Sequence, residues 1–182
     1  VYKRQMLYCN ALSEAEGLEP CYSPSPDGFG FWEPKPGYLD KTGYRVPTRA
    51  EMTLASRGTH IECAVPAEVI DLIDNYEWTR RNSDNQFHPA GALRPNEFGL
   101  FDSLSNYSEW LFDPVTVPDD LAGADRRMAI QINSHMRSAY FDTPPSLIRV
   151  GSFFGNIPQN MLDFSAFRLV RSLPEHAGSP GK

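Results

Sequence analysis

The spacing of apolar positions predicts helices in the first part of the chain. A first helix is expected over Tyr2 to Ala15, with Glu14 and Glu16 facing outward and Gly17 as its stop. The apolar positions of this helix are Met6, Leu7, Cys9, Ala11 and Leu12. It is followed by a stretch rich in proline and glycine, residues 20–42, which predicts a long irregular loop.

A second helix is predicted from its capping residues. Thr48 can accept a hydrogen bond from the backbone N–H of Glu51, and the Glu51 carboxylate can accept one from the N–H of Thr48. This helix should run to about Arg57, where Gly58 ends it. A third, weaker helical pattern covers residues 66–75, with apolar positions at Val69, Ile70 and Ile73.

From Tyr76 onward, turn residues interrupt short apolar stretches. Leu147 to Val150 and Phe167 to Val170 are the strand candidates. Helices early in the chain, followed by short strands and long ordered loops, predict an α+β fold with little regular secondary structure.

Composition excludes several classes of function. The chain has 182 residues and a net charge of −6, and basic residues form no stripe, so we expect no nucleic-acid partner. It has no apolar run long enough to span a membrane. Three cysteines, Cys9, Cys21 and Cys63, predict buried thiols rather than a disulfide framework or a zinc site. We expect a cytoplasmic rather than a secreted protein.

Several short strings follow one another in a fixed order. They are GYRVPTRAEMTLASRG (43–58), NEFGLFDSLSNYSEW (96–110), Arg137 in MRSAYFDTPP, Arg149 in LIRVGSFFG, Pro158, and SAFRLVRS (165–172). Their order and spacing resemble the formylglycine-generating-enzyme, or sulfatase-modifying-factor, domain family. The resemblance implies a C-type-lectin-like fold. It also implies that residues 1–172 form a domain lacking its N-terminal part, and that residues 173–182 are a disordered tail.

The second string contains candidate ligands for a metal ion. Asp102 and Glu109 supply hard oxygen atoms of the kind that calcium binds. The resemblance implies a structural calcium loop in which Asp102, Glu109 and the carbonyl groups of Ser105 and Tyr107 hold the ion. The chain departs from the family string at Ser105, Tyr107 and Ser108. A capped turn with solvated acids and no metal is the alternative.

The stretch between Arg137 and Arg149 lacks the chemistry of the enzymes in this family. Their counterpart carries two cysteines that bind copper and activate oxygen, whereas RSAYFDTPPSLIR contains none. We therefore expect no copper site and no catalytic residue. A related iron-dependent branch needs a histidine cluster, and the four histidines form no close pair. Arg137, Arg149 and Arg168 are expected to be structural; the alternative is that they line a pocket for an anionic ligand.

The leading hypothesis from the sequence is a pseudoenzyme: a non-catalytic binding or sensory module of a larger bacterial protein, fused to a Ser/Thr kinase or another domain. Its ligand would be a protein, a peptide or a small molecule. The alternative is an oxidoreductase that converts a substrate cysteine to formylglycine. Aromatic residues between Tyr76 and Phe153 are numerous. They predict buried area in a loop-rich fold, or rings on loops that stack against a sugar or a peptide.

Overall fold

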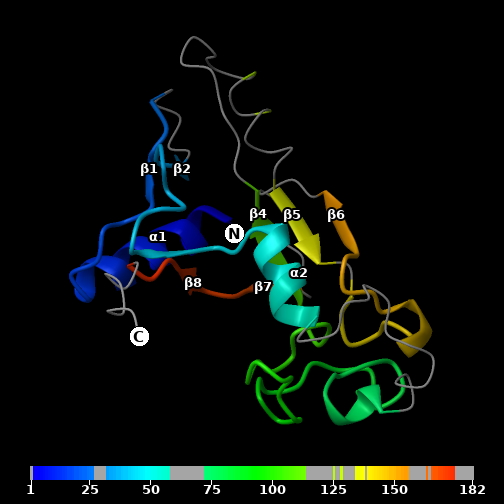
Figure 1. Cartoon of the computed structure of the whole chain (residues 1–182). Helices are drawn as coiled ribbons and strands as arrows, with labels where there is room; N and C mark the ends of the chain where they lie inside the picture. Colours follow the sequence, from blue (N-terminus) through cyan, green and yellow to red (C-terminus); the bar gives the residue numbers. More distant parts are fainter. Residues whose placement is uncertain are drawn as a thin grey trace, which may run out of the picture. The chain divides into compact units, whose positions relative to one another are not determined.

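The structure is a computed structural model of the whole chain (Figure 1). It describes residues 2–26, 32–57, 72–113, 125, 128, 134–137, 139–155, 163 and 165–174. The chain divides into two compact units: residues 1–46 with 169–182, and residues 47–168. Among the described residues, no helix has the length and apolar character needed to cross a membrane.

The first unit combines one helix with two pairs of very short strands. Helix α1 (Tyr2–Ala15) is followed by β1 (Tyr22–Pro24) and β2 (Trp32–Pro34), which pair antiparallel. Strand β3 (Tyr44–Arg45) pairs antiparallel with β8 (Val170–Arg171), so the two ends of this unit meet in one ladder. The predicted bounds of α1 are confirmed, and Gly17, with φ of +69°, ends it as expected.

The buried face of α1 differs from the expected one. Met6 and Cys9 are buried, but Leu7 is 39 % exposed. The rest of the face is polar, because Asn10 and Ser13 bind the backbone of the short strands β1 and β3. Asn10 exchanges two hydrogen bonds with the backbone of Tyr22 (2.9 and 3.2 Å), and the Ser13 hydroxyl accepts one from the N–H of Tyr44 (2.8 Å). Counting apolar positions alone therefore predicted the wrong buried face for α1.

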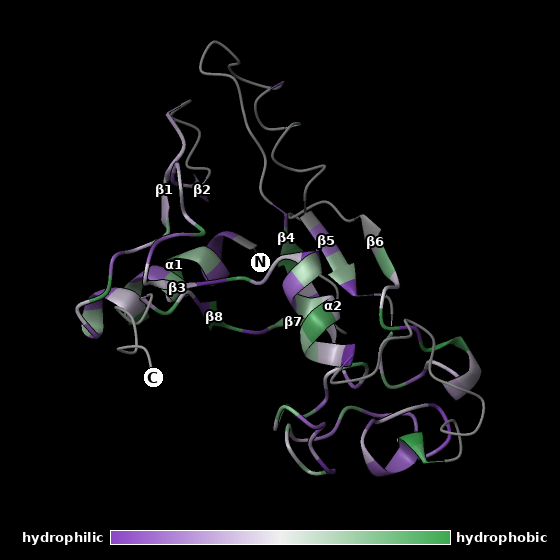
Figure 2. Cartoon of the chain, in the orientation of Figure 1, coloured by the Kyte–Doolittle hydropathy of each residue, from purple (hydrophilic) through white to green (hydrophobic). Residues whose placement is uncertain are grey.

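The second unit opens with helix α2 (Arg49–Arg57). The capping box is confirmed: the Thr48 N–H donates to Glu51 Oε2 (2.9 Å), and the Glu51 N–H donates to Thr48 Oγ1 (3.1 Å). Figure 2 shows that α2 carries both hydrophilic and hydrophobic residues. Met52 and Ser56 are its buried positions, and the helix packs against strand β4.

A four-stranded sheet forms the centre of this unit, in the order β6-β5-β4-β7 (Figure 1). Its strands are β4 (Ser108–Phe112), β5 (Ser134–Arg137), β6 (Phe153–Gly155) and β7 (Ser165–Phe167). Strand β5 runs antiparallel to both of its neighbours, β4 and β6. Strands β4 and β7 run parallel, with Trp110 opposite Phe167. Every residue of β4 is buried. A central strand in this environment shows no alternation of apolar and polar residues, which is why the sequence did not reveal it.

Two short 3₁₀ helices lie in the loops of this unit, η1 (Ile73–Asn75) and η2 (Pro145–Leu147). Ile73, Ala139 and Ile148 pack together there, with Leu104 beside them. The predicted third helix is described only from residue 72 onward, and there it is η1; Val69 and Ile70 lie outside the described residues.

Neither strand candidate keeps its predicted bounds. Leu147 to Val150 is not a strand, since Leu147 ends η2 and only Arg149 makes an isolated bridge. Pro144 and Pro145 favour a turn there because their φ angles are fixed and they offer no N–H to a ladder. Phe167 to Val170 covers the end of β7, a break, and the start of β8.

Candidate functional site

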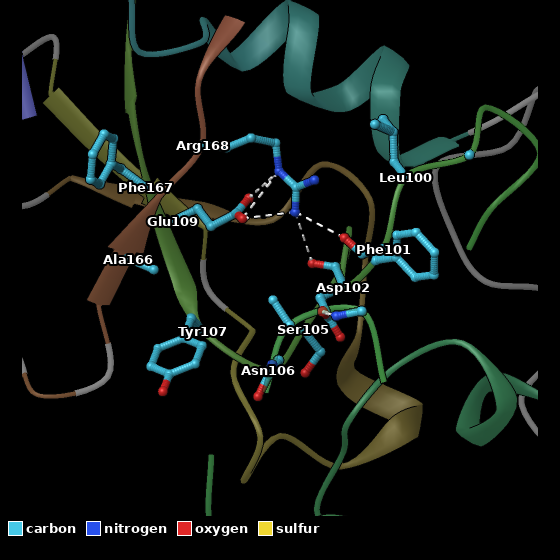
Figure 3. Close-up of a pocket in the computed structure, with 13 residues that line it drawn as sticks. Leu100, Phe101, Asp102, Ser105, Asn106, Tyr107, Glu109, Ala166, Phe167 and Arg168 are labelled. Atoms are coloured by element: carbon cyan, nitrogen blue, oxygen red, sulfur yellow. Dashed lines mark hydrogen bonds and ion pairs between the residues drawn. The ribbon is translucent and has the colours of Figure 1, made fainter. Parts of the chain in front are cut away.

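The candidate site is a pocket of about 590 Å³ in the second unit. Its walls come from the loops before β4 and from the end of β7 (Figure 3). It is lined by Ala90, Gly91, Gly99, Leu100, Phe101, Asp102, Ser105, Asn106, Tyr107, Glu109, Ala166, Phe167 and Arg168. All four residues predicted to hold calcium, and one of the three predicted structural arginines, therefore line one pocket.

An ion pair between Glu109 and Arg168 crosses this site (Figure 3). Glu109 lies on β4 opposite Ala166 of the parallel neighbour β7, and Arg168 follows two residues later. Side chains two residues apart on an extended chain point to the same side, so the guanidinium reaches the carboxylate. Nη2 of Arg168 donates to Glu109 Oε1 at 2.9 Å, and Nε of Arg168 lies 3.2 Å from the same oxygen.

The same guanidinium also binds backbone of the neighbouring loop. Nη2 of Arg168 donates to the carbonyl oxygen of Phe101 at 3.0 Å and to that of Asp102 at 3.4 Å. Burial by itself would lower the pKa of Arg168, but the charge and hydrogen bonds of Glu109 outweigh it and raise the pKa. Arg168 is therefore a permanent cation that ties the loop at residues 101–102 to strand β4.

Asp102 holds an uncommon position in this loop. Its φ is +50°, in the left-handed region that aspartate and asparagine tolerate better than most residues. It is 8 % exposed; Oδ2 accepts a hydrogen bond from the N–H of Gly91 (2.8 Å), whereas the buried Oδ1 has no partner among the described residues. Asn106 is also left-handed, with φ of +71°, but Ser105 is not, so serine at that position brings no left-handed strain.

The turn that carries these residues is held from behind by Glu77. Its carboxylate accepts hydrogen bonds from the N–H groups of Leu104 (3.0 Å) and Ser105 (2.9 Å) and from the Ser103 hydroxyl (3.3 Å). Burial raises the pKa of Glu77 to about 7, although those N–H groups and nearby Arg137 act in the opposite direction. Sequence reasoning missed Glu77, because nothing in its local string marks it.

Arg137 is a second cation of this region, and it is fully buried. It lies at the end of β5, is 1 % exposed, and donates from Nη2 to the Ser56 hydroxyl at 2.6 Å. Its Nε and Nη1 have no hydrogen-bond partner among the described residues. Burial lowers the pKa of Arg137, and the charges of Glu109 and Glu77 oppose that shift. Its positive charge is thus shared by two carboxylates.

Arg149 is placed differently from the other two arginines. It is exposed, and among the described residues its Nη1 donates to the nearby carbonyl groups of Ser146 and Ile148, each at 2.8 Å. The three arginines predicted to be structural are therefore placed differently: Arg137 is buried, Arg168 is partly buried in the pocket wall, and Arg149 is exposed and closes its own turn.

The pocket fits a calcium ion in part. The unpartnered Oδ1 of Asp102 is the kind of oxygen that a cation would satisfy. The Glu109 carboxylate, however, is held by Arg168, and binding through both acids would require Arg168 to release it. Among the described residues, no three or more His, Cys, Asp or Glu side chains are grouped so that they could hold a metal. Calcium therefore stays a prediction.

The described thiols belong to the first unit, and neither is among the residues that line this pocket. Cys9 and Cys21 are buried and free. Burial raises the pKa of Cys9 to about 12 and also raises that of Cys21, whose Sγ donates to the carbonyl of Gly43 (3.4 Å). Both are therefore protonated, unreactive core thiols at neutral pH. Cys63, His60, His176, Ser138 and Pro158 lie outside the described residues.

Replacing a buried arginine should destabilise the chain far more than replacing the exposed one. Arg137→Met keeps most of the volume but removes the fully buried cation near Glu77 and Glu109, so we expect the free energy of unfolding to fall by about 3 kcal/mol or more. Arg149→Met is the matched control and should change it by less than about 0.5 kcal/mol. Urea unfolding of both variants measures this. Equal losses in the two would contradict the assignment.

Stability should depend on pH through Glu77. Its folded pKa of about 7 lies above the ordinary 4.5, so the folded state binds the proton more tightly. The resulting stabilisation is complete below about pH 4.5 and is lost as pH rises through 7, a change of about 3 kcal/mol. Urea titrations at several pH values measure it. Glu77→Gln should remove this slope; an identical slope in the variant would assign the effect to other groups.

Two comparisons with curated proteins connect the chain to larger proteins. The chaperone protein LppX of Paenibacillus barcinonensis is 29 % identical over 138 residues, which cover 62 % of this chain and 49 % of that protein. The serine/threonine-protein kinase pkn1 of Chlamydia caviae is 31 % identical over 96 residues, which cover 53 % of this chain and 15 % of the kinase. The chain spans about half of the first relative and a smaller part of the second.

Solved structures show the same fold. Treponema denticola variable protein 1 matches 92 % of this chain and 68 % of its own, with a TM-score of 0.71 and 23 % identity. CarF matches 95 % of this chain and 66 % of its own, with a TM-score of 0.64 and 22 % identity. PvdO from Pseudomonas aeruginosa matches 94 % of this chain and 60 % of its own, with a TM-score of 0.59 and 20 % identity. These matches confirm the predicted α+β, C-type-lectin-like fold.

A family model agrees with the resemblance read from the ordered strings. The model of the sulfatase-modifying factor enzyme 1-like domain matches residues 2–173, nearly the whole chain. The chain therefore belongs to the FGE-sulfatase family, whose members carry a sulfatase-modifying factor enzyme 1-like domain.

Proposed function

We propose that this domain is a non-catalytic binding module, and that its ligand site is the pocket beside Glu109 and Arg168. The observation that carries the proposal is the pocket itself. Its volume of about 590 Å³ is in the range of small-ligand sites, and its wall combines aromatic rings with a few fixed polar groups. Arg168 and Glu77 fix that wall by hydrogen bonds, so the site is formed before a ligand arrives.

The sequence supports binding over oxidation. Copper-dependent oxidation of a cysteine uses thiolate ligands on the protein, and no cysteine lies between Arg137 and Arg149. Cys9 and Cys21 are buried in the other unit, with raised pKa values. Membership of the family supplies the fold, and function depends on the side chains placed in it.

The relatives favour a domain that serves within a larger protein. One is a serine/threonine-protein kinase of which the matching segment is 15 %, and another is a chaperone of which it is 49 %. We propose that this domain likewise binds a ligand on behalf of an attached bacterial domain, such as a kinase. Its partner would be a protein, a peptide or a small molecule that enters the pocket.

The chain should not convert cysteine to formylglycine. A peptide containing Cys-x-Pro-x-Arg, incubated with the protein, Cu(I), a reductant and oxygen, should keep its thiol, because the segment between Arg137 and Arg149 has no cysteine pair to bind the copper. Mass spectrometry of the peptide measures the outcome, and the matched Ser-x-Pro-x-Arg peptide controls for unrelated oxidation. An aldehyde formed only from the cysteine peptide would overturn the proposed function and favour the oxidase.

Calcium binding by Asp102, Glu109 and the carbonyl groups of Ser105 and Tyr107 is a separate proposal. A ligand that binds only the folded state stabilises it by about 2.7 kcal/mol at a hundredfold excess over its Kd. Melting should then rise with calcium and fall with a chelator, and Asp102→Ala should abolish the response. Asp142→Ala is the control, because Asp142 binds the exposed Arg80 outside the pocket. A melting curve that ignores calcium would defeat the proposal.

A further inference from the structure

We propose that the pocket takes an uncharged aromatic side chain of a bound peptide. The inference rests on the proposed function, because it names the class of ligand for the same pocket. Three features of the wall support it: the groups that a ligand can reach, the charges beside them, and a row of aromatic rings that ends at the pocket.

Two uncharged polar residues of the wall, Ser105 and Asn106, are bound to partners within the chain. The Asn106 amide exchanges two hydrogen bonds with the backbone of His88 (3.0 and 3.2 Å), and the Ser105 hydroxyl donates to the carbonyl group of Trp78 (2.6 Å). Each of the two residues is 1 % exposed. They shape the wall but offer a ligand almost no polar surface. A sugar, whose hydroxyl groups need several hydrogen-bond partners, therefore has little support here.

The side chains that a ligand can reach are mostly apolar. Phe101 is exposed, and Leu100, Tyr107 and Phe167 are half-buried. Gly99 contributes only backbone, and a Cβ atom placed on it would meet no heavy atom beyond its chain neighbours within 4 Å. A wall of this kind gains free energy by removing apolar surface of a ligand from water.

The charges of the wall favour an uncharged ligand. The Arg168 guanidinium is paired with Glu109 at 2.9 Å, and the charge of Asp102 also acts on it and helps to raise the pKa of Arg168. An anionic ligand would bring a third negative charge to this one guanidinium. An ammonium group would find Oδ1 of Asp102 covered, and would find Oδ2 of Asp102 and Oε1 of Glu109 already bound. Calcium would require Arg168 to release Glu109, so this description applies to the calcium-free pocket.

One donor of the wall is left for a neutral acceptor. Nε and Nη2 of Arg168 bind Glu109 and two carbonyl groups, whereas Nη1 donates to none of the described residues and is not fully covered (Figure 3). The carbonyl oxygen of a peptide bond is a strong acceptor without charge. A peptide therefore brings both an apolar side chain and an acceptor for Arg168, which a free aromatic hydrocarbon does not.

A row of aromatic rings ends at the pocket. Phe141 meets Phe87 edge to face, with ring centroids 4.5 Å apart, and Phe87 stacks on Tyr107 at 4.2 Å. Tyr107 lines the pocket and has no second ring partner among the described residues. Phe101 and Phe167 line it from two other segments (Figure 3). An aromatic side chain would extend this row, because aromatic rings favour offset and edge-to-face contacts with one another.

The test compares two blocked peptides that differ in one side chain. Acetyl-Gly-Trp-Gly-amide and acetyl-Gly-Ala-Gly-amide are titrated, in the presence of a chelator, into the ¹⁵N-labelled chain while the amide signals of residues 99–109 are followed. We expect the tryptophan peptide to shift these signals and to bind about tenfold more tightly than the alanine peptide. Two further probes are the tryptophan peptide with a free carboxylate and 3-methylindole, the same ring without a peptide group. Both should bind more weakly than the amide.

Phe101→Ala should abolish the preference for tryptophan. Phe98→Ala is the matched control, because Phe98 is also exposed and belongs to the same loop but does not line the pocket. Neither substitution removes a buried side chain, and thermal melting checks that both variants fold.

Several outcomes would overturn the inference. They are equal binding of the two blocked peptides, an absence of any shift with the tryptophan peptide, and an undiminished preference in Phe101→Ala. Tighter binding of the carboxylate form would replace the uncharged class with an anion, and tighter binding of 3-methylindole would replace the peptide with a free aromatic compound. Either of these results would leave the binding module intact. The assay with the cysteine peptide judges the proposed function separately.

Discussion

The contact on which the site depends is the one between the Arg168 guanidinium and the Glu109 carboxylate. It joins two parallel strands, β4 and β7, and the same guanidinium holds the carbonyl groups of Phe101 and Asp102. Without that cation, the buried carboxylate of Glu109 would lack its nearest counter-charge and the loop would lose its link to the sheet. A buried ion pair gains little free energy overall, but the loss of either partner is costly. Its contribution here is to fix the position of the loop.

In this fold, polar side chains form hydrogen bonds with backbone groups that helices and sheets would pair elsewhere. The turn before β4 belongs to no ladder, yet two of its N–H groups are bound by Glu77, and the Asn106 side chain exchanges two hydrogen bonds with the backbone of His88. Buried backbone groups must find partners, so a loop-rich domain needs buried acids and amides. The raised pKa of Glu77 is a consequence of this arrangement, since the carboxylate that binds the turn is also removed from water.

Local signals in the sequence predicted local structure well. The bounds of α1, its stop at Gly17 and the capping box of Thr48 and Glu51 follow from residues within a few positions of one another. The polar face of α1, the buried strand β4 and the role of Glu77 depend on partners 12 or more residues away, such as Tyr22 for Asn10 and Leu104 for Glu77. Asp102, Glu109 and Arg168 were singled out through the resemblance, but their pairing became visible only when β4 and β7 were placed side by side.

The cysteine-free segment between Arg137 and Arg149 contributes to packing and to a turn. After Arg137 ends β5, Ala139 and Ile148 are buried against Ile73, and the chain between them turns on the Thr143 hydroxyl, which accepts from the N–H of Tyr140. These positions pack a core and close a turn, and neither purpose needs sulfur. Copper chemistry could therefore be absent here without any cost to folding. The proposed binding function needs only the scaffold that positions the loop around Asp102, because a pocket whose wall is already fixed requires no further chemistry to hold a ligand.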